Sequence, residues 1–82
     1  MDLLNAVREV LGDVLQLGER SAALHVDSGL LGELSELDSM AVVTIITGLE
    51  DRFGFIVEDD ELVGDVFETL GSLTEFVVEK LR

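Results

Sequence analysis

The segment between Asp38 and Gly54 constrains the fold more than any other part of the chain. Its apolar residues recur with the period of an α-helix and lie within about 60° of one direction on a helical wheel: Val42, Ile45, Ile46, Leu49 and Phe53. Asp38 is suited to cap the start of such a helix, and Gly54 to end it. Several residues are β-branched, but strand alternation fits the pattern less well. The sequence therefore predicts a helix that runs to about Phe53 and buries one face.

The same segment carries a second set of side chains that points away from the buried face: Met40, Val43, Thr44, Thr47, Glu50 and Asp51. Exposed apolar side chains beside one another usually mark an interaction site. The alternative is that the preceding connection packs over Met40 and Val43. The sequence leaves both explanations open.

Further helical patterns lie on either side of this segment. Apolar residues recur with helical spacing from Leu3 to Leu17, where Asp2 is a suitable cap and Gly18 a suitable left-handed end. A leucine-rich connection then leads to Leu37, and we expect it to pack down on the helices. Its length is typical of a functional segment.

The C-terminal part predicts a short helical piece between Leu62 and Phe67 and a last helix after Gly71, capped by Ser72. The buried face of that helix is expected to hold Leu73, Phe76, Val77 and Leu81. The chain has 82 residues, which is too few for a second core. We therefore predict an all-α fold, a small four-helix bundle of three main helices plus a short third one, with a long first loop and a single domain over 1–82.

Charge narrows the range of partners. Eighteen acidic residues and five basic ones give a formal net charge of −13, which disfavours nucleic acid and anionic membranes. The charge suits partners with basic patches, and it is equally consistent with simple solubility. The chain has no cysteine for disulfides, and no apolar run approaches the ~20 residues of a membrane span. We expect a cytoplasmic monomer.

Ser39 follows the predicted cap and occupies the first position of the helix. Backbone N–H groups lack partners there and the helix dipole is positive, so a phosphodiester on Ser39 would be stabilised. Asp38 would help to position a divalent metal while a transferase delivers the phosphate. Taken alone, the pair is better explained as an ordinary helix cap followed by a serine.

The stretch LLGELSELDSMAVVTIITGLEDRFG, from Leu30 to Gly54, resembles the acyl carrier proteins and the related peptidyl carrier domains. Their second helix opens with Asp-Ser-Leu or Asp-Ser-Met, and the segment from Thr69 to Leu73 resembles the start of their final helix. The resemblance implies a carrier and not an enzyme. Ser39 would bear 4′-phosphopantetheine, added from coenzyme A by a phosphopantetheinyl transferase, and the terminal thiol would hold acyl groups as thioesters.

The resemblance also assigns a surface for the acyl-loading and acyl-accepting enzymes, at Met40, Val43, Thr44, Thr47, Glu50 and Asp51. Ala41 and Thr44 stand where carriers of fatty-acid synthesis usually have acidic residues, which favours a specialised pathway. Carriers of this family serve fatty-acid, polyketide or exopolysaccharide biosynthesis. The sequence ELDSMAVV…ITGLEDRFG looks most like that of bacterial carriers associated with exopolysaccharide and exosortase systems.

Two other classes of protein compete with this interpretation. An unmodified acidic helical adaptor would bind a partner through Met40, Val43 and Thr47. A calcium-binding module would use the acidic run from Glu58 to Glu61, although that run lacks the ligand spacing of an EF-hand and we assign no metal site. The second Asp-Ser pair, Asp27-Ser28, is expected to form a turn, and His25 has no partners for catalysis.

Overall fold

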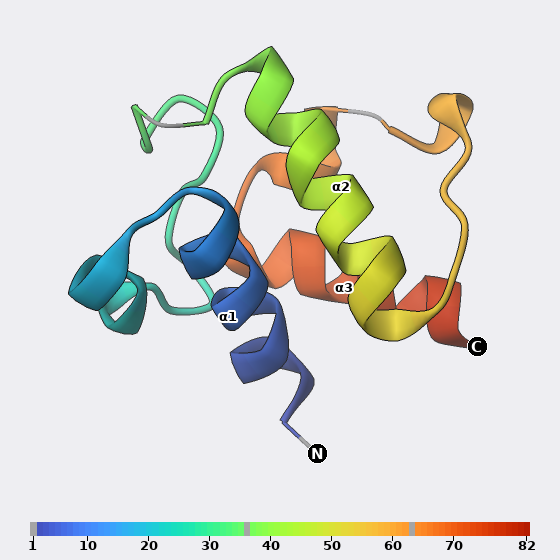
Figure 1. Ribbon diagram of the computed structural model, residues 1–82, viewed down its shortest axis with the longest axis horizontal. Coiled ribbons are helices and arrows are strands. Elements are labelled where there is room, and N and C mark those ends of the chain that lie inside the picture. Colours follow the sequence, from blue (N-terminus) through green and yellow to red (C-terminus); the bar gives the residue numbers. More distant parts are fainter. Residues whose placement is uncertain (1, 36, 63) are drawn as a thin grey trace.

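The computed structural model describes residues 2–35, 37–62 and 64–82, and it is built from helices (Figure 1). The elements follow the order α1 (Leu3–Val14), η1 (Gly18–Ala23), α2 (Ser39–Phe53), η2 (Asp59–Glu61), η3 (Gly64–Phe67) and α3 (Leu70–Leu81), where η denotes a 3₁₀ helix. Among these described residues there is no strand, only an isolated bridge between Gly29 and Thr69. The predicted all-α fold is confirmed.

The core forms where α1 packs against both α2 and α3. Its fully buried side chains come from every main helix and from the long connection: Val7, Leu11, Leu30, Ile45, Leu49, Leu70, Leu73 and Val77. Burying one such side chain stabilises the fold by about 1.5–3 kcal/mol. Leu30 belongs to the connection between η1 and α2, so that connection packs into the core as predicted.

Backbone hydrogen bonds fix this connection to the start of α3. The N–H groups of Leu30 and Leu31 donate to the backbone carbonyls of Glu68 and Phe67, at 3.0 and 2.9 Å. In the other direction, the N–H groups of Leu70 and Gly71 donate to the backbone carbonyls of Ser28 and Val26, at 3.0 and 2.9 Å. The chain that leads into α2 is thus tied to the opposite end of the sequence.

The first helix ends earlier than the sequence predicts. It stops at Val14, and the left-handed residue at its end is Gln16, with φ 54°. Gly18 is left-handed as predicted, with φ 59°, but it starts η1 and does not end α1. The N–H of Leu17 donates to the carbonyl of Gly12 at 3.0 Å, as in a Schellman ending. Leu15 and Leu17 would point in opposite directions on a continued helix, and the early turn lets both enter the core.

The last helix begins earlier than predicted. Thr69, not Ser72, is its cap, and the hydroxyl of each residue accepts the backbone N–H of the other at 3.0 Å. This capping box brings Leu70 into the helix, where its side chain is fully buried. Leu73 and Val77 are buried as predicted, and Phe76 is partly buried. The prediction for Leu81 is wrong, because its side chain is 47% exposed at the end of the helix.

The short helical piece predicted between Leu62 and Phe67 is also different in detail. Leu62 is not helical, residue 63 lies outside the described residues, and η3 covers Gly64–Phe67 as a 3₁₀ helix. A further 3₁₀ turn, η2, precedes it. Val66 and Phe67 are buried, so η3 serves mainly to place these two side chains against the core.

Candidate functional site

The start of α2 has the geometry that the sequence predicts. Asp38 has extended backbone angles, and its Oδ1 accepts the N–H of Ala41 at 2.8 Å. The N–H of Val42 donates to the Asp38 carbonyl at 3.0 Å, which closes the first helical turn. The cap fixes where the helix begins, and therefore fixes Ser39 as its first residue.

Ser39 is exposed at this helix start. Within the described part of the chain, neither its hydroxyl nor its backbone N–H makes a hydrogen bond, and the same holds for the N–H of Met40. A phosphate on the Ser39 oxygen would lie beside unpaired donors and the positive end of the helix dipole. The residues present therefore fit a phosphodiester-linked group.

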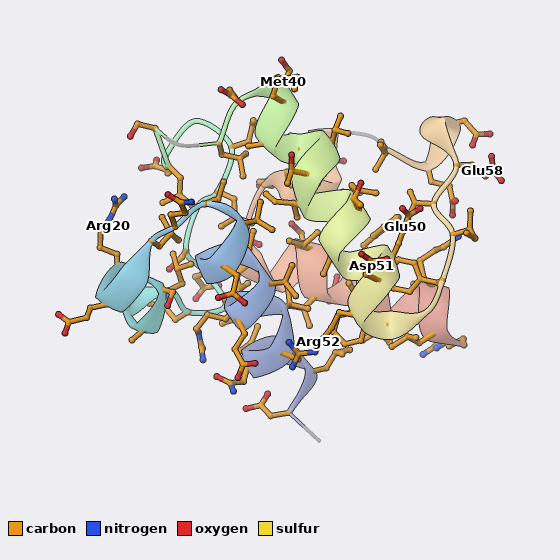
Figure 2. The ribbon with its side chains drawn as sticks, viewed as in Figure 1. Arg20, Met40, Glu50, Asp51, Arg52 and Glu58 are labelled. Atoms are coloured by element: carbon orange, nitrogen blue, oxygen red, sulfur yellow. The ribbon has the colours of Figure 1, made fainter. Side chains whose placement is uncertain are left out.

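The two faces of α2 differ as the wheel predicts. Ile45, Ile46 and Leu49 are buried, and Val42 and Phe53 pack partly buried against the same core. On the other side, Met40 is 74% and Val43 59% exposed, and the hydroxyl-bearing Thr44 and Thr47 are exposed as well. Figure 2 shows Met40 at the N-terminal end of α2, directed away from the molecule. The long connection does not cover this face.

Glu50 and Asp51 lie near the other end of α2 and have different surroundings (Figure 2). Glu50 is half-buried, and its Oε2 accepts the N–H of Val57 at 2.8 Å. Asp51 is exposed. Of the two, Asp51 has the more accessible carboxylate.

One exposed apolar side chain near this end of α2 was not singled out from the sequence. Ile56 is 71% exposed, whereas its neighbours Phe55 and Val57 are partly buried against the core. Phe55 stacks on Phe53 with ring centroids 6.3 Å apart. Phe55 and Val57 point inward and Ile56 points outward, as in an extended segment with one buried face. This alternation with period two could have identified Ile56 as exposed from the sequence.

The acidic run after α2 is tied into the fold. Glu61 accepts the N–H of Glu58 at 2.8 Å and pairs with Lys80 of α3 at 2.9 Å. The hydrogen bond from Glu58, together with the Lys80 ammonium, lowers the pKa of Glu61 below its usual 4.5. Over the described ranges, no group of three or more acidic or histidine side chains is arranged to hold a metal ion.

The second Asp-Ser pair lies in a turn, as predicted. The N–H of Ser28 donates to the carbonyl of His25 at 2.9 Å, and the Ser28 hydroxyl accepts the N–H of His25 at 2.9 Å. Ser28 is only half exposed. It therefore differs from Ser39, which is exposed at the start of a long helix and whose hydroxyl bonds none of the described residues.

An exposed serine at the capped start of α2, in a small helical bundle, is an arrangement that suits a carrier domain with a covalent prosthetic arm. The family model described as "Phosphopantetheine attachment site" matches residues 3–77. A solution structure of a holo acyl carrier protein from Nitrosomonas europaea is 59% identical to this chain with a TM-score of 0.91, covering 99% of this chain and 98% of that one. The comparison with curated proteins gave no match.

The chain therefore belongs to the acyl carrier protein family. It is a carrier and not an enzyme, and its prosthetic group is 4′-phosphopantetheine. The unmodified adaptor considered above has no support, because the matching family is defined by attachment of this group. Within the described residues, no helix is long and apolar enough to cross a membrane.

Proposed function

We propose that Ser39 is the attachment residue and that the loaded arm carries acyl thioesters between enzymes of a specialised pathway. The observation that carries the assignment is the exposed Ser39 next to the Asp38 cap, whose hydroxyl makes no hydrogen bond to the residues that the structure describes. Ser28, in the competing Asp-Ser pair, already accepts a hydrogen bond within a turn.

In the loading reaction, the Ser39 oxygen forms a bond to the phosphate that bears pantetheine. The pyrophosphate bond of coenzyme A breaks, its nucleotide half leaves, and the hydroxyl proton passes to a base on the transferase or to solvent. Asp38 keeps the helix start in place and would offer a carboxylate oxygen to a divalent metal brought with coenzyme A. The N–H groups of Ser39 and Met40, which bond none of the described residues, would stabilise the negative charge of the product. Once bound, the arm supplies a thiol for thioester chemistry.

The surface that meets partner enzymes is proposed to comprise Met40, Val43, Thr44, Thr47, Glu50 and Asp51. Support comes from the exposure of the first four beside Ser39 and of Asp51 at the far end. Ala41 and Thr44 lack the carboxylates usual in carriers of fatty-acid synthesis, which supports a dedicated pathway such as exopolysaccharide biosynthesis. The single domain over 1–82, the cytoplasmic location and the monomeric state stay predictions.

The function is tested on protein purified from its native host at mildly acidic pH, which preserves thioesters. We expect an intact mass above that of the phosphopantetheine form, returning to that form after treatment with hydroxylamine. Fragmentation should place the modification on the peptide that contains Ser39. A mass increment that resists hydroxylamine, or one located at Ser28, would be incompatible with the proposal.

A further inference from the structure

The part of α2 next to Ser39 has no charge, in a chain that is otherwise strongly acidic. The whole sequence carries 18 acidic residues in 82, yet no charged residue occurs between Asp38 and Glu50. The charges of α2 are confined to its last turns, at Glu50, Asp51 and Arg52. The surface of α2 is therefore neutral from Ser39 as far as Leu49.

The exposed side chains of this stretch also offer few polar groups. Met40 and Val43 are the two exposed large apolar residues of α2. The hydroxyls of Thr44 and Thr47 donate within the helix, to the carbonyls of Met40 and Val43, each at 3.1 Å. Both hydroxyl protons are already used, so neither threonine requires an acceptor from a partner. We call Met40, Val43, Thr44 and Thr47 the neutral face.

The acidic groups beyond the neutral face are only partly available. Glu50 accepts the N–H of Val57 at 2.8 Å, and Arg52 pairs with Glu9 of α1 at 3.1 Å. Asp51 is the exposed acidic group of α2 at that end. The carboxylates of Glu50 and Asp51 thus lie about one turn beyond Thr47, and Asp38 lies at the cap. None of them stands among Met40, Val43 and Thr44.

These observations decide the chemistry of the occupant. A cationic patch pressed on Met40, Val43 and Thr44 would lose hydration and find no carboxylate of α2 between Asp38 and Glu50 to replace it. An acidic patch would be repelled by the net charge of −13. An apolar patch loses no hydrogen bonds and removes Met40 and Val43 from water.

We propose that the neutral face of α2 is the docking site for an apolar, cation-poor patch on the enzymes that reach Ser39, the phosphopantetheinyl transferase included. The contact beside the arm is stabilised by burial of apolar surface, so screening of charge by salt should weaken it little. The inference rests on the proposed attachment at Ser39. Beyond that attachment, it specifies the chemistry of the partner surface that recognises the carrier.

The test measures KM and kcat for transfer from coenzyme A by a broad-specificity phosphopantetheinyl transferase. Val43→Glu and Thr44→Glu place a carboxylate on the neutral face. Leu31→Glu is the control for the first, since Leu31 is 51% exposed and lies outside α2. Thr74→Glu is the control for the second, because its hydroxyl bonds the Leu70 carbonyl in the same way at 2.8 Å. Circular dichroism confirms that each variant is helical.

We expect both neutral-face variants to raise KM about tenfold or more, because a carboxylate in an apolar contact loses its hydration. The kcat values and both controls should stay within about twofold of wild type. Raising ionic strength from about 0.15 to about 1 M shortens the Debye length from about 8 to about 3 Å, and should change the wild-type KM by less than about threefold.

A lower KM for Thr44→Glu would show that the partner patch is cationic and would overturn the inference. So would a Val43→Glu variant that behaves like Leu31→Glu, or a wild-type dimer in sedimentation that Val43→Glu dissociates. Each of these outcomes leaves attachment at Ser39 intact. A wild-type protein that is not modified at all would instead reject the proposed function.

Discussion

The side chain of Glu50 holds the segment that follows α2, because its Oε2 accepts the backbone N–H of Val57 at 2.8 Å. This contact spans the turn at Gly54, whose φ of 75° reverses the chain after the helix. A residue expected to meet partner enzymes thus also fixes the path of the chain toward η2.

Replacement of Glu50 by alanine should loosen this segment. Loss of the partly buried hydrogen bond is expected to lower the free energy of unfolding by about 1 kcal/mol and to speed hydrogen exchange at the Val57 amide. Asp51→Ala is the matched control and should leave both quantities within about 0.5 kcal/mol of wild type. Equal exchange at Val57 in both variants would refute the role of Glu50.

Asp38 is expected to contribute to stability mainly as a helix cap. Asp38→Ala removes the acceptor for the Ala41 N–H and should lower the free energy of unfolding, measured in urea, by about 1 kcal/mol. Asp38→Asn keeps an oxygen at the cap and should lower the free energy of unfolding by only a few tenths of a kcal/mol. If the two variants were equally unstable, the carboxylate charge and not the hydrogen bond would be responsible.

Gly71 permits close contact between α3 and the long connection. A Cβ there would lie 2.7 Å from Val26 Cγ2 and 2.9 Å from the Val26 carbonyl oxygen. Gly71→Ala should therefore reduce the free energy of unfolding by about 1–3 kcal/mol, although alanine favours helices. Gly48→Ala, also within a helix, meets only the methyl groups of Val10 and Val14 at 3.2 and 3.4 Å and should cost less. A more stable Gly71→Ala variant would contradict this packing.

The pair between Glu61 and Lys80 should make a pH-dependent contribution to stability. Because the folded protein lowers the pKa of Glu61, the stabilisation is fully present above pH 4.5 and is lost as pH falls through the lower folded pKa. Glu61→Gln retains an oxygen for the Glu58 N–H but removes the charge. Its melting temperature should lie below that of wild type at neutral pH, and the difference should shrink below pH 4.5. A difference independent of pH would rule out the ionised pair.

The parts of the fold that local residues determine were predictable from the sequence. Asp38 and Gly54 mark both ends of α2, and the helical period separates Ile45 and Leu49 from Met40 and Val43. The end of α1 was not predictable, because it depends on packing Leu15 and Leu17 into the core and places a non-glycine residue, Gln16, at positive φ.

The candidate site shows the same division. The position and exposure of Ser39 follow from the cap at Asp38, which is a local signal. The bond between Glu50 and Val57 depends on how the chain folds back after Gly54. The pair of Glu61 and Lys80 joins residues 19 positions apart, and sequence spacing alone gives no sign of it.

The most direct test of attachment at Ser39 is the intact mass of three purified proteins after incubation with coenzyme A and a broad-specificity phosphopantetheinyl transferase. The proteins are the wild type, Ser39→Ala and, as the matched control for the second Asp-Ser pair, Ser28→Ala. We predict that the wild type and Ser28→Ala each gain one phosphopantetheine and that Ser39→Ala gains none. A wild type of unchanged mass, or a Ser39→Ala variant that is still modified, would contradict the assignment of Ser39.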